Sequence, residues 1–134
     1  MNPEVESKFA TYPEDIRNSL LAIRGLIFDI AAEQNLGDVE ESLKWGQPSY
    51  VVKGGSPVRL GWKAAEPDQL SLFFNCNTTL VATFREVYGG ELEFIGNREL
   101  VIRLHRALPL QPLQHCLRVA LHYHRVKGLP LLGM

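Results

Sequence analysis

The stretch Glu41–Tyr50, ESLKWGQPSY, lies where a helical sequence pattern gives way to a strand pattern. Upstream of it, apolar residues recur every three or four positions, which predicts a helix that begins near Pro13 and ends at Gly37. From residue 39 the period changes to two, so a strand is predicted with Glu41 and Trp45 on the same face. We expect Trp45 to anchor this strand and Gly46-Gln47-Pro48 to break and redirect it.

Further elements are predicted downstream from alternation, helical spacing and turn residues. They are strands at 49–53, 58–63 and 69–75, a helix at 79–88, strands at 91–95 and 98–104, and a helix at 109–127. The strand at 69–75 is apolar on both faces, which favours a central position. The prediction is an α+β fold: a mostly antiparallel six-stranded sheet, two long helices on one face, and the order helix, four strands, helix, two strands, helix.

The chain of 134 residues fits one domain, predicted over residues 12–128. Residues 1–11 are mostly polar and are expected to form a flexible lead-in. Residues 129–134 form an apolar tail, which is expected to dock on its own domain or to pair with a second copy in a homodimer.

The composition argues against several classes of protein. A net charge of −1 does not suit a nucleic-acid binder. We see no secretory signal and no stretch long enough to span a membrane, so a cytoplasmic protein with no membrane partner is expected. Cys76 and Cys116 have no motif spacing and are expected to stay reduced. Because there is no His-x-x-x-His or Cys-x-x-Cys pair, neither a metal site nor a cofactor is predicted.

The stretch Glu41–Tyr50 resembles the Glu-x-x-Lys-Trp-Gly-x-Pro-x-Tyr signature of the YdhG-like family, small bacterial proteins mostly of unknown function. The similarity extends more loosely from about Tyr12 to Gly128. The resemblance implies a frataxin-like fold. It also implies an alternative function, intracellular iron binding as a chaperone, since some relatives are described in that way. Frataxins bind iron through an acidic helix and strand edge, whereas the first predicted helix here has only scattered acids.

The same stretch predicts a ligand-binding groove. In this interpretation Trp45, Tyr50 and Trp62 form its walls, and the polar contacts come from two further residues, Glu41 and Gln47. A buried carboxylate at Glu41 needs a partner, for which Arg59 and Lys63 are candidates. Alternatively, both tryptophans belong to the core and Glu41 lies at a strand end.

Catalysis has less support. Cys76 follows a strand and precedes a helix, where the pKa of a thiol can fall, but no base can be assigned to it. We therefore predict a non-enzymatic module that binds an unknown small molecule or protein. The alternatives are the iron chaperone and an enzyme that uses Cys76 or Glu41.

Overall fold

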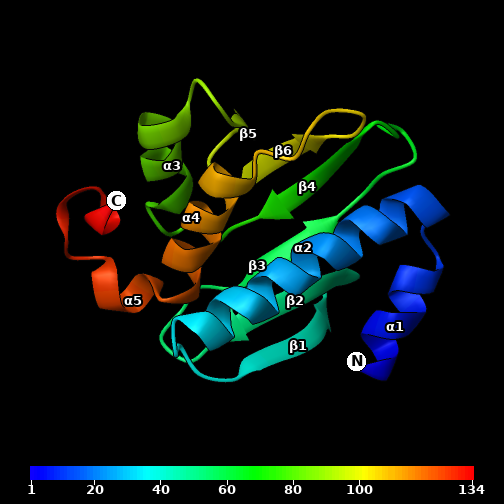
Figure 1. The fold of residues 1–134 in the computed structure, drawn as a ribbon, viewed down its shortest axis with the longest axis horizontal. Helices are drawn as coiled ribbons and strands as arrows, with labels where there is room; N and C mark the ends of the chain where they lie inside the picture. Colours follow the sequence, from blue (N-terminus) through cyan, green and yellow to red (C-terminus); the bar gives the residue numbers. More distant parts are fainter.

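Six strands form one antiparallel sheet in the order β1-β2-β3-β4-β6-β5, in a computed structural model that describes residues 1–134 (Figure 1). The strands are β1 (Val39–Lys44), β2 (Gln47–Val52), β3 (Val58–Gly61), β4 (Gln69–Phe73), β5 (Glu93–Ile95) and β6 (Glu99–Arg103). The predicted α+β class and antiparallel sheet are confirmed. So is the central place of β4, which pairs with β3 and β6.

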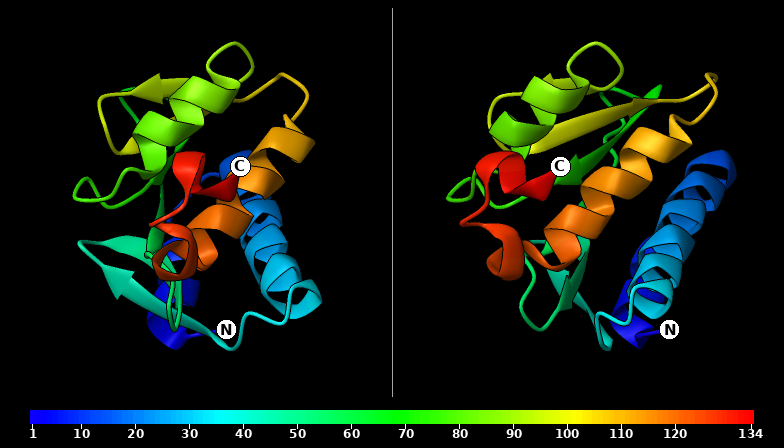
Figure 2. Two further views of the ribbon diagram at one scale, coloured as in Figure 1. Left: turned by 90° about the vertical axis from the view of Figure 1, so that its left-hand side faces the viewer. Right: turned by 60° about the vertical axis from the view of Figure 1, so that its left-hand side comes forward.

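The helices gather on one face of this sheet, as Figure 2 shows from two sides. They are α1 (Pro3–Ala10), α2 (Glu14–Glu33), α3 (Leu80–Tyr88), α4 (Leu110–Leu121), α5 (Tyr123–Val126) and the 3-10 helix η1 (Pro130–Gly133). The two longest, α2 and α4, pack against each other over the sheet. None of these helices combines the length and the apolar character that crossing a membrane would require.

The core lies between the sheet and these helices. Strand alternation sends one set of apolar side chains toward the helices, where the α2 stripe meets them. Buried members from the strands are Tyr50, Val52, Val58, Leu60, Leu70, Leu72, Leu100 and Ile102. Each buried aliphatic side chain contributes roughly 1.5–3 kcal/mol. The other face of the sheet has no helix over it, so the alternate residues of every strand are left on an open face.

The predicted flexible lead-in is instead helix α1. Asn2 caps it, because its Oδ1 accepts hydrogen bonds from the backbone N–H groups of Glu4 at 2.9 Å and Val5 at 3.2 Å. Val5 and Phe9 lie one turn apart and are buried. An isolated helix of eight residues is unstable in water, so packing of this apolar pair holds α1 against β1 and β2.

The β1–β2 connection also differs from the prediction. Lys44 pairs with Gln47, so Trp45 and Gly46 form a two-residue hairpin turn. Both have positive φ, +52° and +75°, as in a type I′ turn. Trp45 is 91% exposed. The prediction that it anchors a strand face is therefore wrong, and Gln47 and Pro48 open β2 instead of breaking a strand.

The last predicted helix is interrupted at His122, which separates α4 from α5. The loop between β2 and β3 causes the break: the Ser56 N–H donates to the Ala120 carbonyl at 2.9 Å, and the His124 N–H donates to the Gly54 carbonyl at 2.9 Å. Two backbone groups at the junction are thereby bonded to this loop rather than within a continuous helix.

The C-terminal tail forms η1, which contacts α3 and α5. Leu132 is buried, so the tail docks in part on its own domain, while Leu129 and Leu131 remain exposed. Dimerisation through these two leucines stays a prediction.

Candidate functional site

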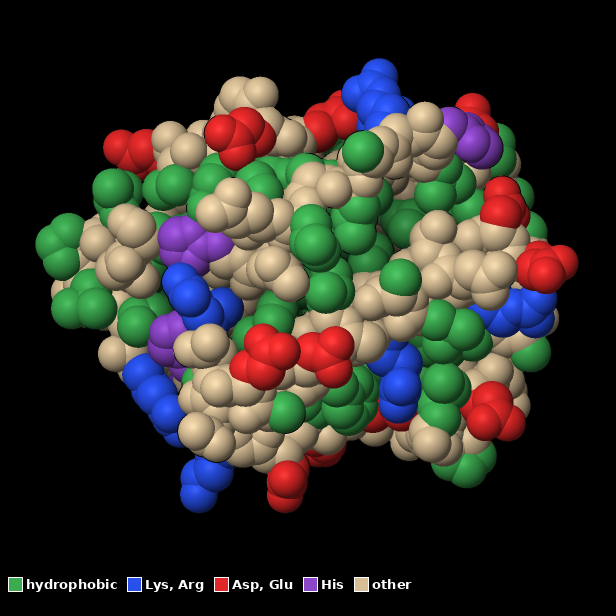
Figure 3. Space-filling model, in the orientation of Figure 1, with side chains coloured by type: hydrophobic (Ala, Val, Ile, Leu, Met, Phe, Trp, Pro, Cys, Tyr) green, Lys and Arg blue, Asp and Glu red, His purple; other side chains and the backbone are tan.

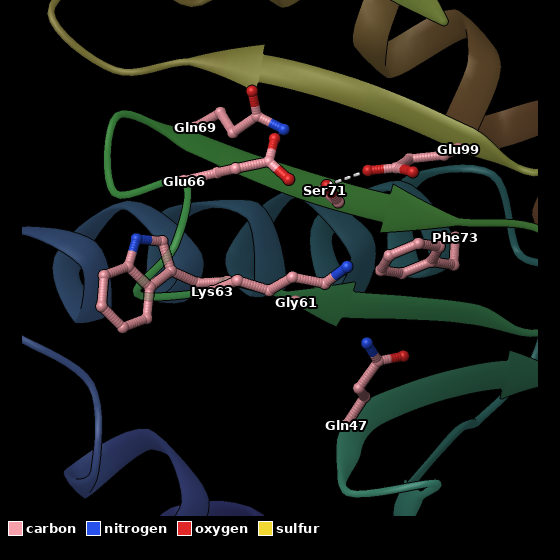
Figure 4. A pocket seen from close by; sticks show the side chains of 9 residues that line it. Gln47, Gly61, Lys63, Glu66, Gln69, Ser71, Phe73 and Glu99 are labelled. Carbon is pink, nitrogen blue, oxygen red and sulfur yellow. Dashed lines mark hydrogen bonds between the residues drawn. The ribbon is translucent and has the colours of Figure 1, made fainter. Parts of the chain in front are cut away.

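The open face of the sheet carries the side chains that do not enter the core. Pairing register sets Ser49, Arg59, Phe73 and Glu99 in one row across β2, β3, β4 and β6. Figure 4 looks onto part of this face, with α2 behind the sheet. Because the row crosses four strands, residues far apart in sequence share one surface.

Two adjoining hollows on this face form what we call the open-face groove. One, of about 330 Å³, is lined by residues that include Lys44, Trp45, Arg59, Cys76 and Arg98. The other, of about 450 Å³, shares Trp45, Arg59 and Arg98 with it. Ligand pockets typically measure about 300–1,000 Å³, so the groove is large enough for a small molecule.

A smaller hollow of about 20 Å³ adjoins the groove and is shown in Figure 4. Gly61 forms its floor: a Cβ here would lie 2.8 Å from Gln47 Nε2 and 3.0 Å from Phe73 Cε2. The Ser71 hydroxyl donates to Glu99 Oε2 at 2.6 Å, which orients that carboxylate toward β4. This space holds about one water molecule and is too small for an organic ligand.

The open-face groove is positively charged. Four cations line it: Lys44, Arg59, Lys63 and Arg98. One acidic residue, Glu40, lines it as well. None of the four cations has a carboxylate within 4.0 Å, since the ion pairs of the structure lie elsewhere. The whole chain carries a net charge of −1, and on the face seen in Figure 3 acidic and basic side chains are interspersed.

Trp45 stands at the rim of the groove in an unusual conformation. A positive φ costs a bulky residue about 1–2 kcal/mol relative to the ordinary helical region. The side chain is almost fully exposed, so packing does not offset this cost. Sparsely populated backbone conformations cluster at functional sites, and tryptophan is enriched among residues that dominate binding energies.

Glu41 lies on the opposite, helix-covered face. Its Oε2 accepts from Arg24 Nε at 2.6 Å, and its Oε1 accepts from the Asn2 N–H at 2.9 Å and Arg24 Nη2 at 3.3 Å. Burial alone would raise the pKa of Glu41, but these hydrogen bonds outweigh it and hold the pKa below its usual value. The predicted partners, Arg59 and Lys63, are wrong because they lie on the other side of the sheet.

Tyr50 pairs directly with Glu41 between β1 and β2 and is fully buried, edge-on to Phe28 at 6.0 Å. Its hydroxyl makes no hydrogen bond of ordinary geometry. Burial, and after it the nearby Glu41 carboxylate, raises the pKa of Tyr50. Tyr50 therefore belongs to the core and cannot form a wall of the groove.

The five predicted site residues thus divide between the two faces. Trp45 and Gln47 line the open-face groove, whereas Glu41 and Tyr50 face the helices. Trp62 borders the small hollow, where its Nε1 donates to the Pro67 carbonyl at 3.1 Å and its ring packs edge-on to Tyr12 at 6.3 Å. The expectation that all five residues line a single groove is wrong. It assumed that the alternation of β1 continues through residue 45, whereas the strand ends in a turn at Trp45.

Sequence reasoning missed the residues that define the groove. Arg59 and Phe73 lie opposite each other on β3 and β4, with the Arg59 guanidinium carbon 5.8 Å from the Phe73 ring centroid. Arg98 comes from the β5–β6 loop. The available signal was the alternation of these strands, which sets Arg59 and Phe73 on the face away from Leu60 and Leu72.

A second polar pocket, of about 280 Å³, is lined by residues of α2, α3 and α4. Here Tyr88 Oη lies 2.5 Å from His115 Nδ1. Burial, and after it the charge of Arg118, lowers the pKa of His115, which favours a neutral ring whose Nδ1 accepts a hydrogen bond from the Tyr88 hydroxyl. Sequence reasoning did not bring these two residues together, since 27 residues separate them.

The other candidates for chemistry are dispersed. No three His, Cys, Asp or Glu side chains come together as a group that could hold a metal ion. Cys76 is exposed and lines the groove, but no histidine lines it with Cys76. Cys116 is buried, and burial raises the pKa of its thiol to about 12, which makes it unreactive.

Comparison of the chain with protein-family models, with curated proteins and with solved structures gave no match in any of the three.

Proposed function

We propose that this protein is a non-enzymatic binding module and that the open-face groove is its site for a small molecule or a protein partner. The observation that carries the proposal is the placement of Trp45. An almost fully exposed tryptophan, held at positive φ, borders a groove whose cations have no carboxylate partners. The type I′ turn accounts for the positive φ of Trp45 but does not require a tryptophan there, whereas binding accounts for an exposed ring beside cations that lack carboxylate partners.

The two alternatives have less support. An iron chaperone, which the YdhG-like resemblance implies, needs clustered acids, and Glu41 is already bound to Arg24. An enzyme acting through Cys76 needs a base, and the groove offers one acid, Glu40, with no histidine beside it. A cytoplasmic setting remains part of the proposal, in keeping with two unpaired cysteines.

A ligand screen on the whole chain tests the proposal. A library of metabolites and fragments is screened by ¹H–¹⁵N NMR, and hits are mapped by their amide shifts. Tryptophan fluorescence is then followed in a Trp62→Phe variant, in which Trp45 is the remaining indole. We expect hits to shift amides of the groove around Arg59 and Arg98 and to change Trp45 emission.

Trp45→Asn is the matched variant for this screen, because asparagine tolerates positive φ and removes the ring. It should keep the fold and weaken the binding of groove ligands. If the hits shift only amides around Tyr88 and His115, the site is the second pocket and the proposal is wrong.

A further inference from the structure

We infer that the ligand of the open-face groove is a phosphorylated compound with a planar ring, of which a 5′-mononucleotide is the simplest example. This inference rests on the proposed function and names the chemistry of its ligand. It is carried by the juxtaposition of the Trp45 ring with the four groove cations, Lys44, Arg59, Lys63 and Arg98.

The charge of the groove selects an anion. Four cations against Glu40 leave a local excess of positive charge, which Glu66 and Glu99 of the adjoining small hollow reduce but do not cancel, although the chain as a whole is slightly negative. A neutral apolar ligand would desolvate these cations without compensation, which is unfavourable. A metal cation would be repelled. A single carboxylate compensates one charge, whereas a phosphate carries up to two and accepts several charge-assisted hydrogen bonds.

Two arginines suit phosphate in particular. A guanidinium presents several N–H donors in a planar fork that matches phosphate oxygens. The Arg59 guanidinium carbon lies 5.8 Å from the Phe73 ring centroid, and its N–H groups form no ion pair, so they are left for a ligand. Glu99 lies in the same cross-strand row as Arg59. Its carboxylate accepts a hydrogen bond from the Ser71 hydroxyl and is not paired with an arginine. The two arginines thus keep their donors available.

The Trp45 ring supplies the surface for a planar group. It is exposed beside Arg59 and Arg98, and the turn holds its backbone at φ +52°. Stacking of a base on an aromatic side chain contributes about 1–3 kcal/mol. Polar groups that could contact the ring edge or a sugar also line the groove. Asn75 is one: its Oδ1 accepts from the Asn77 N–H at 2.8 Å, which leaves its amide N–H₂ to donate.

Binding of defined probes to the whole chain tests the inference by calorimetry and by the fluorescence of the Trp62→Phe variant. The probes are the four common 5′-ribonucleotides, the corresponding nucleosides, inorganic phosphate, and a short single-stranded oligonucleotide. We expect at least one mononucleotide to bind about tenfold or more tightly than its nucleoside and than phosphate, with affinity falling as salt rises.

Three variants separate the two parts of the site. Trp45→Asn should weaken nucleotide binding about 5- to 150-fold and leave phosphate binding unchanged. Arg98→Gln should weaken both about tenfold or more, because it removes a charged donor. Arg17→Gln removes the same charge from α2, on the covered side of the sheet, and should change neither.

Each contrary result overturns a stated part. If phosphate binds as tightly as the nucleotides, the groove does not recognise the planar ring. If a nucleoside binds as tightly as its nucleotide, the groove does not recognise the phosphate. Much tighter binding of the oligonucleotide, increasing with its length, would indicate a nucleic-acid surface instead. If no probe binds while the library screen finds other groove ligands, this inference fails and the proposed function stands. If nothing binds the groove in either experiment, both fail.

Discussion

Replacing Glu41 with alanine should destabilise the fold, because this carboxylate joins three elements. It accepts hydrogen bonds from Arg24 on α2 and from the Asn2 N–H that precedes α1, while its own backbone lies in β1. Its side chain is 7% exposed and that of Arg24 is 23% exposed. The alanine variant leaves Arg24 with a partly buried charge and no partner.

The expected loss is about 2–3 kcal/mol. Removing one partner of a fully buried ion pair costs about 3–5 kcal/mol, but Arg24 can recover part of its hydration through its exposed portion. Arg24 also keeps its contact with Phe28, whose ring centroid lies 4.5 Å from the guanidinium carbon. For a chain of 134 residues, 1 kcal/mol corresponds to about 3.5 °C in Tm, so Tm should fall by about 7–11 °C.

Thermal and urea denaturation at pH 7, followed by circular dichroism, measure this loss. Glu40→Ala is the matched control: it removes the neighbouring carboxylate, which faces the open side and has no ion pair, and should cost less than about 0.5 kcal/mol. A double-mutant cycle with Arg24→Met should give a coupling of about 1–3 kcal/mol. If Glu41→Ala is no more destabilising than Glu40→Ala, the reasoning about this pair is refuted.

The pH dependence of the same pair has a definite sign. The pKa of Glu41 is lower in the folded protein than the ordinary value of 4.5. Its contribution is therefore fully present above pH 4.5 and is lost as the pH falls through the lower folded-state pKa. The stability difference between the wild type and Glu41→Ala should be constant near neutral pH and shrink in acid. A difference that grows in acid would contradict the lowered pKa.

Four further substitutions test other parts of the structure by urea denaturation. Trp45→Asn should leave stability unchanged or raise it by up to about 1 kcal/mol, because asparagine tolerates positive φ; a large loss would mean that the exposed ring packs in solution. Gly55→Ala should cost roughly 1–3 kcal/mol, since its Cβ would lie 2.3 Å from the Leu121 carbonyl oxygen. Gly25→Ala in α2 should instead stabilise the fold by about 0.5–1 kcal/mol, because a Cβ there meets nothing within 4 Å. Equal effects of the two variants would refute this contrast. Phe9→Ala should cost about 3–5 kcal/mol if α1 is docked as described, and a negligible cost would indicate a loose N-terminus.

Periodicity alone predicted most of the fold. The α2 stripe has six apolar residues at helical spacing, so this helix followed from the sequence. The central place of β4 was also predicted correctly, although its open face carries the polar residues Gln69 and Ser71 as well as Phe73. The α1 helix was missed although its signals are present: Asn2 as a cap, Pro3 in the first turn and acids after it. Its single buried pair, Val5 and Phe9, was too short a pattern to stand out.

The candidate site was predicted less well, for two physical reasons. Alternation identifies the face of a residue only while the strand continues, and Trp-Gly lacks the Asn or Asp that usually marks a type I′ turn. Extending β1 through Trp45 therefore assigned it to the face of Glu41. The pairing of Glu41 with Arg24 and the meeting of Arg59 and Arg98 at one groove are set by tertiary packing and have no local sequence signal.

The opening hairpin thus combines two separate roles in one short stretch. At Glu41 the chain is tied to the helices, and four residues later Trp45 is presented on the other face. Because β1 is an edge strand paired only with β2, its position depends on that tie, and the rim of the groove depends on the position of β1. Substitutions at Glu41 should consequently lower the free energy of unfolding and, as β1 loosens, weaken binding at the groove. Trp45→Asn should weaken binding without lowering stability. Variants of Glu41 and of Trp45 in the same hairpin therefore separate an effect on stability from an effect on binding.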